Sequence, residues 1–213
     1  MLPQSAGAVR TLACLVHKNW AMRKAGMETR RIILGMSGAS GAILGIRLLE
    51  ALQSTDIETH LIMSEWAEKT VALETEYTVE KVKTLASAVY TPGDMAAHIS
   101  SGSFLTDGMV VCPCSMKTLA AIASGFSHNL ITRCADVSLK EGRKLLLVPR
   151  ETPLSAIHLE NLLKLSRLGV KILPPCVGFY TKPRTVEEIV SHLTGKILDM
   201  LEIENHMYRR WGD

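Results

Sequence analysis

The chain has 213 residues, of which 47% are hydrophobic. This is enough for one domain with a substantial core and too little for two large ones. The formal net charge is only +3 and aromatic residues make up 5% of the chain, a balance that excludes the usual signature of a nucleic-acid-binding protein. The sequence has no apolar run of the roughly 20 residues that a membrane-spanning helix needs. Five cysteines, an odd number, do not indicate a disulfide framework, so we expect a reducing compartment such as the cytoplasm.

The N-terminal segment differs from the rest of the chain. Residues 1–27 contain basic residues but no aspartate or glutamate. One interpretation is a mitochondrial targeting segment, which is amphipathic and poor in acidic residues. The other is a disordered or non-native extension ahead of a start at Met27. We expect the second, and therefore divide the chain into an extension (1–30) and a single domain (31–213).

From Arg31 onward, short apolar runs alternate with amphipathic stretches. In chain order this pattern predicts a strand at 31–36, a helix at 40–53, a strand at 58–63, helices at 65–73 and 78–86, a strand at 109–112, helices at 115–124 and 134–140, a strand at 144–148, a helix at 157–168, a strand at 170–173 and a final helix at 185–201. Such alternation is typical of an α/β domain in which helices cover both faces of a parallel sheet.

The most informative local feature is the glycine-rich turn between the first strand and the first helix. Its glycines, from Gly35 to Gly41, follow the spacing G-x-x-G-x-x-G. This is neither a P-loop nor the usual dinucleotide fingerprint. Glycines let the backbone approach a phosphate, and we expect the following helix to offer free amides and the positive end of its dipole. The alternative is a tight structural turn without a ligand.

Polar residues also follow the later strands, and the carboxyl ends of parallel strands are where such sheets bind ligands. Ser64 follows the second strand, where it is either a helix cap or a ligand contact. Ser115 and Thr118 lie near another helix start, a position that favours anions. Arg150 and Glu151 follow the buried strand 144–148. They suit phosphate binding with adjacent acid–base chemistry, or else form a surface ion pair.

Glu74 and Tyr180 each allow a functional and a structural interpretation, whereas the cysteines and histidines do not indicate a metal site. Glu74 is either a second carboxylate of the site or a solvated helix end. Tyr180, after a stiff proline-containing loop, is either a site hydroxyl or a packing residue at the rim. Cys112 and Cys114 have no second cysteine pair, and the histidines are scattered, so we expect no metal site.

Taken together, several segments resemble the UbiX-type flavin prenyltransferase family, some members of which have been called phenylacrylic or hydroxyarylic acid decarboxylases. The matching strings include GMSGASGAILGIRLLEAL, ETHLIMSEWA, LETEY, SSGSFLTDGMVVCPCSMKTLA, RCADVSLKEGRKLLLVPRETPLSAIHLENLLKLSRLG and ILPPCVGFY. The resemblance covers nearly all of the chain beyond the N-terminal extension. It implies a Rossmann-like, flavodoxin-type three-layer sandwich around a central parallel sheet, and a homododecamer.

The resemblance also implies a metal-independent reaction. Reduced FMN is joined at N5, and then at C6, to the dimethylallyl group of dimethylallyl phosphate. The product is prenylated FMN, the cofactor of a partner UbiD-type decarboxylase.

Site residues follow from the resemblance position by position. Residues expected to contact FMN are Gly38, Ala39, Ser40, Ser64, Ser115, Met116, Lys117, Thr118 and Arg133. Residues expected to hold the dimethylallyl phosphate, in part across subunits, are Lys140, Arg150, Tyr180 and Lys196. Glu151 is the expected acid–base residue, with Ser40 as a proton relay and Glu74 lining the same pocket.

Two other functions compete with this interpretation. A flavin-dependent cysteine decarboxylase of the phosphopantothenoylcysteine type has an asparagine-containing motif that CPCSMKTLA lacks. A non-catalytic subunit that carries flavin for a decarboxylase would not need Glu151 beside a phosphate site. The aromatic residue that shields the allylic group is left open, and Trp66 is near Ser64 in sequence only.

Overall fold

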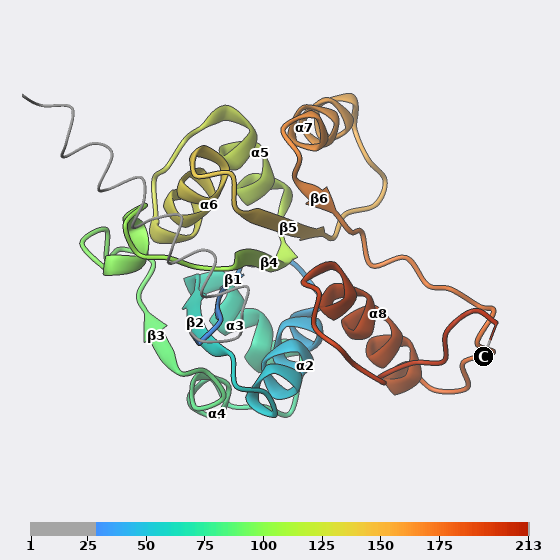
Figure 1. Ribbon diagram of the computed structural model, residues 1–213. Helices are drawn as coiled ribbons and strands as arrows, with labels where there is room; N and C mark the ends of the chain where they lie inside the picture. The colour runs from blue at the N-terminus through green and yellow to red at the C-terminus, as the bar shows by residue number, and fades with distance from the viewer. Residues whose placement is uncertain (1–28, 213) are drawn as a thin grey trace, which may run out of the picture. The chain divides into compact units, whose positions relative to one another are not determined.

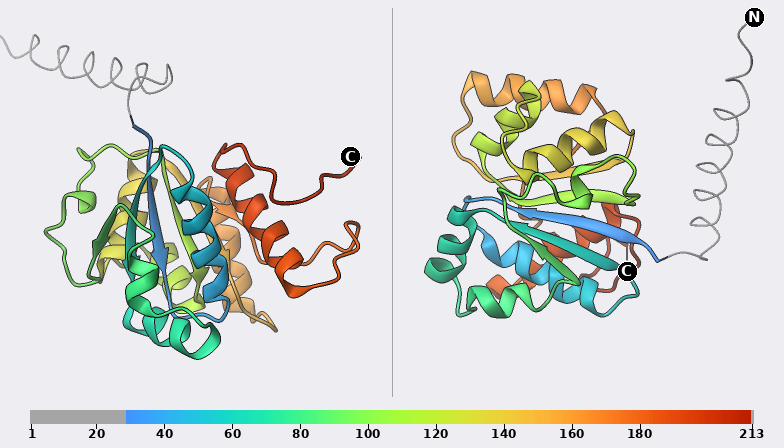
Figure 2. Two further views of the ribbon diagram at one scale, coloured as in Figure 1. Left: turned by 90° about the horizontal axis from the view of Figure 1, so that it is seen from below. Right: turned by 90° about the vertical axis from the view of Figure 1, so that its left-hand side faces the viewer.

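The computed structural model describes residues 29–212 (Figures 1 and 2). The predicted extension at 1–30 falls almost entirely outside the described residues. The second of two compact units begins at Arg31 and contains every element below. In chain order the elements are β1 (Arg31–Met36), α2 (Ala42–Gln53), β2 (Glu58–Met63), α3 (Glu65–Glu74), α4 (Val79–Lys83), β3 (Ala88–Tyr90), η1 (His98–Ser100), β4 (Gly108–Cys114), α5 (Met116–Ser124), α6 (Leu130–Lys140), β5 (Lys144–Pro149), α7 (Ala156–Arg167), β6 (Lys171–Ile172) and α8 (Val186–Met200).

Six strands form one sheet in the order β3-β2-β1-β4-β5-β6, and all neighbouring pairs are parallel. The chain runs outward from β1 to β3 and then returns to β4 on the other side of β1. The strand order therefore reverses between β1 and β4, which is where open α/β sheets leave a crevice for ligands. The predicted α/β sandwich with a central parallel sheet is confirmed.

Helices cover both faces of the sheet, as Figure 2 shows from two sides. On one face α2, α3 and α8 enclose the core that includes Ile32 and Leu34. On the other face α5, α6 and α7 enclose the core that includes Ile33. Successive strand residues point to opposite faces, so β1 contributes to both cores and is buried beyond its first residue. No helix within residues 29–212 is long and apolar enough to cross a membrane.

Helix starts differ from the prediction where the backbone, rather than the apolar pattern, decides them. The helix expected from residue 40 begins at Ala42, because Gly41 has a φ of +100°, a left-handed conformation outside the helix. The helix expected from 134 begins at Leu130. There the side chains of Asn129 and Thr132 bond each other's backbone amides at 3.0 and 3.2 Å in a capping box.

The shortest elements were either not predicted or predicted to be longer than they are. The strand β3 was missed because three partly exposed residues are too few to show an alternating pattern. The strand expected at 170–173 retains strand pairing only at Lys171–Ile172, and the helix expected at 78–86 is reduced to α4. The strand expected at 109–112 continues to Cys114, with an irregularity in its register against β5.

A buried histidine ties the edge of the sheet together. His60 on β2 is 1% exposed, and its Nδ1 lies 2.9 Å from the hydroxyl of Tyr90 on β3. Its Nε2 lies 3.1 Å from the carboxylate of Glu58, which also accepts a 2.8 Å bond from Nε of Arg31. Burial lowers the pKa of His60 below its usual value, and the nearby carboxylate of Glu58 opposes that shift. The neutral ring is therefore favoured in the folded protein.

We predict that acid destabilises the protein partly through His60. In the unfolded chain the pKa of His60 returns to about 6.5. Above pH 6.5 the ring is neutral in both states, and burying it carries no protonation cost. Stability is then lost as the pH falls from about 6.5 through the lower pKa of the folded state. The urea midpoint of the wild type should fall more steeply between pH 7 and pH 5 than that of His60→Gln. Equal slopes for the two proteins would contradict this assignment.

Candidate functional site

The turns that follow β1 and β4 are bonded to each other at the point where the strand order reverses. The amide and the hydroxyl of Ser37 both donate to the carbonyl of Pro113, at 3.1 and 3.0 Å. The same hydroxyl accepts a 2.7 Å bond from the amide of Ser115. Ser37 is buried, so these bonds are shielded from water. The two turns that carry most of the predicted flavin contacts are thereby held in one arrangement.

Ser64 and Ser115 both cap helices at this edge of the sheet. The Ser64 side chain accepts a 3.1 Å bond from the amide of Ala67 and starts α3. The Ser115 hydroxyl accepts from the amide of Thr118 at 3.3 Å and donates to its side chain at 3.1 Å, which starts α5. Both helices therefore begin at the carboxyl edge of the sheet, with the positive ends of their dipoles there.

The start of α2 is arranged differently from the prediction. Gly41, its N-cap, has no side chain to cap the helix. Instead the carboxylate of Glu74, at the end of α3, accepts bonds from the amides of Gly41 and Ala42 at 2.8 and 3.3 Å. The glycine-rich turn predicted free amides at this helix start. These two amides are instead occupied by Glu74 and are not available to a phosphate. The carboxylate takes the position at this helix start that an anion would otherwise favour.

We predict that Glu74 contributes measurably to stability through this cap. Glu74→Ala should lower the free energy of unfolding by about 1 kcal/mol, the usual cost of losing an N-terminal cap. Glu74→Gln should lose less, because its amide oxygen can still accept both bonds. Urea denaturation of the two variants checks this, with Glu76→Ala as an exposed control from the same segment. A loss as large in Glu76→Ala would rule out the cap as the cause.

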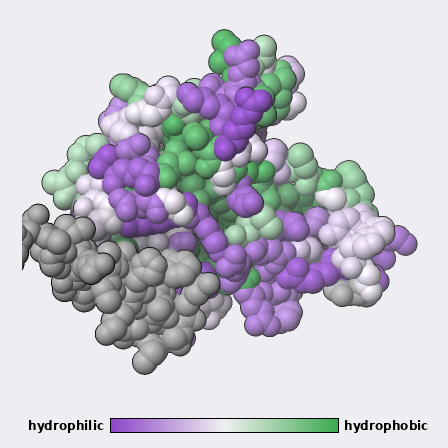
Figure 3. Space-filling view, turned by 45° about the horizontal axis from the view of Figure 1, so that its top comes forward, coloured by the Kyte–Doolittle hydropathy of each residue, from purple (hydrophilic) through white to green (hydrophobic). Residues whose placement is uncertain are grey.

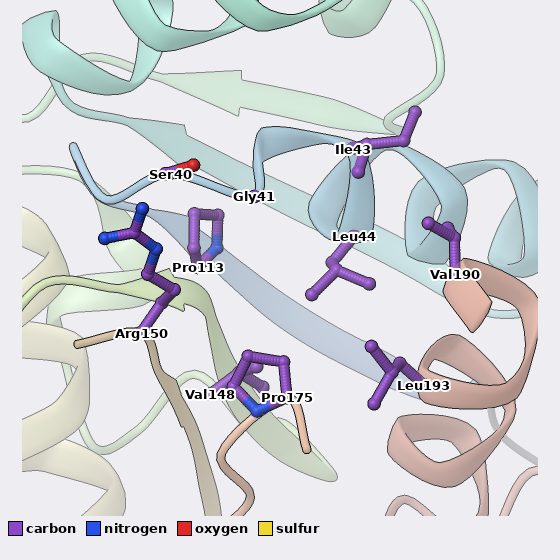
Figure 4. Close-up of a pocket in the computed structure, with 10 residues that line it drawn as sticks. All are labelled: Ser40, Gly41, Ile43, Leu44, Pro113, Val148, Arg150, Pro175, Val190 and Leu193. Atoms are coloured by element: carbon purple, nitrogen blue, oxygen red, sulfur yellow. The ribbon is translucent and has the colours of Figure 1, made fainter. Parts of the chain in front are cut away.

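A pocket of about 190 Å³ opens beside this turn (Figure 4). Ser40 and Arg150 supply its polar side chains and lie at the same end of it in the view of Figure 4. The rest of the wall is apolar and comes from α2, the ends of β4 and β5, the segment after β6, and α8. The residues that complete the lining are Gly41, Ile43, Leu44, Pro113, Val148, Pro175, Val190 and Leu193.

Arg150 and Glu151 follow β5 directly, and neither forms an ion pair within residues 29–212. The amide of Arg150 donates to the carbonyl of Cys114 at 3.2 Å, which fixes its backbone beside β4. The Glu151 carboxylate accepts a 3.0 Å bond from the amide of Thr152 within its own turn and is exposed. The surface ion pair considered for these two residues does not form.

Other predicted site residues lie away from the pocket in a single chain. Lys140 ends α6 beside Glu141, with which it is ion-paired, shortly before the first residue of β5. Arg150 follows the last residue of β5, so the strand separates the two by about 20 Å at the usual rise per residue. Arg133 lies inside α6, where its Nε donates to the carbonyl of Ser100 at 3.1 Å.

Tyr180 and Lys196 belong to a separate group around α8. The Tyr180 hydroxyl lies 3.2 Å from Nε2 of His192, and its ring contacts that of Trp211 with centroids 5.2 Å apart. The Lys196 amine lies 4.0 Å from the carboxylate of Asp199. Neither Tyr180 nor Lys196 lines the pocket, so one chain brings Ser40 and Arg150 together there without them.

The glycine-rich turn packs against an exposed tryptophan. A Cβ atom added at Gly38 would lie 2.3 Å from the Cβ of Trp66, so only glycine allows this approach. Trp66 is 63% exposed, and the amine of Lys69 lies 4.4 Å from the centre of its ring. Ala39, the next residue of the turn, is buried. Trp66 is thus an aromatic residue beside the predicted flavin contacts, which its position in the sequence alone did not establish.

Two cysteines border the pocket residue Pro113, and a third lies in the core beneath α6. Cys112 and Cys114 flank Pro113 on β4, and Cys134 lies on α6; all three are buried. Burial raises the pKa of Cys114 and of Cys134 to about 12, so both remain thiols at neutral pH. Within residues 29–212 no three histidine, cysteine, aspartate or glutamate side chains are placed to hold a metal ion.

Known proteins share both the sequence and the fold. The family model described as Flavoprotein matches residues 21–198. Flavin prenyltransferase LpdB of Lactiplantibacillus plantarum is 55% identical over 186 residues, which cover 86% of this chain and 100% of that protein. The chain belongs to the UbiX-type flavin prenyltransferase family. The resemblance inferred from the sequence motifs is confirmed.

Two solved structures of UbiX-type relatives extend the comparison. AnUbiX (PadA1), solved in complex with FMN and dimethylallyl pyrophosphate, is 51% identical with a TM-score of 0.86, over 87% of this chain and 99% of that one. The dodecameric FMN-dependent UbiX-like decarboxylase of Escherichia coli O157:H7 is 55% identical with a TM-score of 0.85, over 86% of this chain and 100% of that one. The Rossmann-like sandwich predicted for this chain is therefore the fold of its family.

Proposed function

We infer that the protein is a flavin prenyltransferase. It joins the dimethylallyl group of dimethylallyl phosphate to N5 and C6 of reduced FMN, and the product is prenylated FMN for a UbiD-type decarboxylase. One observation carries the proposal: a chain that is 55% identical over 186 residues to a named flavin prenyltransferase has an arginine and a hydroxyl beside an otherwise apolar pocket at the ligand-binding edge of its sheet. A cysteine decarboxylase is disfavoured because CPCSMKTLA lacks its asparagine, and a flavin carrier would not need Glu151 next to Arg150.

The residues at the start of α5 fit FMN. As the first residues of the helix, Met116 and Lys117 have amides without a partner inside it, and within residues 29–212 no other bond to them is formed. The hydroxyls of Ser115 and Thr118 lie beside them. Because Glu74 occupies the start of α2 by binding the amides of Gly41 and Ala42, we assign the anionic part of FMN to the start of α5. Gly38, Ala39, Ser40, Ser64 and Arg133 complete the proposed flavin contacts.

The pocket fits the prenyl donor. Reduced FMN, when bound, supplies the nucleophilic nitrogen. The Arg150 guanidinium neutralises the charge that grows on the phosphate as it leaves, which is the largest contribution a protein makes to such a step. Glu151 donates the proton that the leaving phosphate needs and later removes one, with Ser40 as the relay. The apolar walls keep water away from the reacting allylic group.

The remaining phosphate ligands come from neighbouring subunits in this proposal. In one chain Lys140 lies at the opposite end of β5 from Arg150, and neither Tyr180 nor Lys196 lines the pocket. In this proposal a homododecamer brings copies of the three residues to Arg150. Figure 3 looks onto the side that carries α5, α6 and α7, where hydrophobic surface covers much of the centre. Three apolar side chains of α7 are more than half exposed, namely Ile157, Leu159 and Leu163, and so is Leu168 directly after the helix. Such a surface supports association with further copies of the chain.

Anaerobic incubation with reduced FMN and dimethylallyl phosphate tests the function directly. The recovered flavin should gain the mass of one prenyl unit, and oxidised FMN serves as the control. We propose the monophosphate as donor, so the diphosphate is run in parallel. A flavin of unchanged mass with both donors would refute the prenyltransferase, and release of carbon dioxide from phosphopantothenoylcysteine would identify the decarboxylase instead.

We also propose a cytoplasmic location, which the mass of the mature N-terminus from native cells would test against mitochondrial import.

A further inference from the structure

We propose that His192 on α8 is a positioning residue for Tyr180. It donates a hydrogen bond to the Tyr180 hydroxyl, so that the proton of this hydroxyl points at the phosphate of the prenyl donor. The inference rests on the proposed function, in which Tyr180 is a phosphate ligand. It gives a role to a buried histidine that lines neither the pocket nor the predicted flavin contacts.

The ring of His192 is enclosed by the segments before and after α8. It is 7% exposed, and its Nε2 lies 3.2 Å from the Tyr180 hydroxyl. A Cβ atom added at Gly178 would lie 2.8 Å from Cε1 of the ring, so the segment before the helix packs closely against it. The ring of Tyr208 lies against it as well, with centroids 4.7 Å apart. These contacts leave the ring little freedom to turn, and Nε2 stays directed at Tyr180.

The Tyr180 side chain, by contrast, has room for a second partner. It is 42% exposed, and within the described part of the chain its hydroxyl forms no hydrogen bond other than the one with His192. A tyrosine hydroxyl donates one hydrogen bond and can also accept one. His192 takes one of these two interactions, and the other is available to a ligand.

The chemistry of the ligand decides which way the bond between the two side chains runs. A phosphate dianion has only acceptor oxygens, so the hydroxyl of Tyr180 must donate its single proton to it. The hydroxyl oxygen can then only accept from His192, which requires a proton on Nε2. With the proton on Nδ1 instead, the ring would accept from Tyr180 and turn the hydroxyl proton away from the phosphate.

The surroundings of the ring fit this arrangement. Burial lowers the pKa of His192, and the charge of Lys196 lowers it further, so the ring is neutral at pH 7 and carries one proton. Placing that proton on Nε2 gives a chain of donors from the ring to the hydroxyl to the phosphate, in which each bond strengthens the next. Lys196 lies four residues beyond His192, on the same side of α8, and is itself an expected phosphate ligand. One part of α8 thus supplies a positive charge and, through Tyr180, a directed hydroxyl.

Calorimetric titration of dimethylallyl phosphate into the protein loaded with oxidised FMN tests the inference without turnover. His192→Leu retains an apolar side chain of moderate size but cannot donate, and it should raise the Kd for the donor about tenfold, the usual effect of one lost hydrogen bond. His192→Gln brings an amide nitrogen near the position of Nε2 and should recover most of that loss. In turnover with reduced FMN, His192→Leu should raise KM for the donor while kcat changes less than about twofold.

A second background separates positioning from packing. In the Tyr180→Phe background, His192→Leu should weaken donor binding no further, because the hydroxyl that His192 orients is absent. Ile197→Ala is the control for stability, since it truncates a fully buried residue of the same helix. It should unfold at lower urea concentration but keep the wild-type Kd. If His192→Leu does not fold, His192→Asn takes its place, because its side chain is too short to reach the hydroxyl.

The outcomes distinguish this inference from the proposed function. An unchanged Kd in His192→Leu, or the same rise in Kd with and without the Tyr180 hydroxyl, would overturn the inference. A wild type that does not bind dimethylallyl phosphate would overturn it as well. A wild type that binds the donor with the expected dependence on His192, yet leaves reduced FMN without a prenyl unit, would refute the transferase and support the positioning role.

Discussion

Glu151→Gln is expected to bind FMN like the wild type and to form prenylated FMN about 10²- to 10⁴-fold more slowly, the usual contribution of a positioned acid–base group. The side chain is exposed and free of ion pairs, so its loss should not disturb the fold. Glutamine keeps the shape and the bond to Thr152 but cannot donate a carboxylic proton to the leaving phosphate. Single-turnover mass spectrometry measures the rate, and titration of flavin fluorescence measures the Kd for FMN.

The control for Glu151→Gln is Glu160→Gln, which removes an exposed carboxylate from α7. It should leave both the rate and the Kd unchanged. Unimpaired turnover of Glu151→Gln would remove this residue from the mechanism. A parallel loss of FMN affinity would make it a binding residue instead.

Arg150→Gln is expected to lower kcat/KM for dimethylallyl phosphate by about 10²- to 10³-fold, the range seen when a donor aimed at developing charge is removed. Glutamine can still fill the polar end of the pocket but leaves the phosphate charge without a counter-ion. Arg150→Lys should recover part of the activity, because it restores the charge without the two-pronged geometry of a guanidinium. Steady-state kinetics at varied donor concentration checks both variants.

Arg167→Gln, at the exposed end of α7, is the charge-matched control for Arg150→Gln. Full activity in Arg150→Gln would show that the phosphate is held elsewhere. The same loss in Arg167→Gln would show that net charge, rather than position, matters.

The sequence predicts the sheet well, because buried parallel strands are short apolar runs that few other structures produce. The 58–63 strand matches β2 at both ends, and Lys144 begins β5 as expected. The strand ends also predict much of the site, because the residues that follow parallel strands lie together at the carboxyl edge of the sheet. Ser40 and Arg150, 110 residues apart, meet at one pocket for this reason. Elements of two or three residues carry no periodic pattern, so neither β3 nor the true extent of β6 could be predicted from the sequence.

Side-chain partners between distant elements could not be predicted. Glu74 caps α2 only because α3 ends beside the start of that helix, and nothing in LETEY distinguishes this carboxylate from that of Glu76. Val190 and Leu193 form a pocket wall because of the way α8 packs on α2, whereas their spacing indicates only a buried helix face. Lys140 precedes β5 and Arg150 follows it, so the two residues lie at opposite ends of that strand. The sequence motifs alone do not reveal this separation.

The burial of Cys112, Cys114 and Cys134 has a consequence for the lifetime of the protein. Reduced flavins react with oxygen and release peroxide, and peroxide oxidises thiolates far faster than thiols. Cys114 and Cys134, with pKa values raised to about 12, present almost no thiolate to that oxidant. These buried thiols thus resist the peroxide that reduced flavin generates, and exposed Cys176 is the described cysteine most open to oxidation.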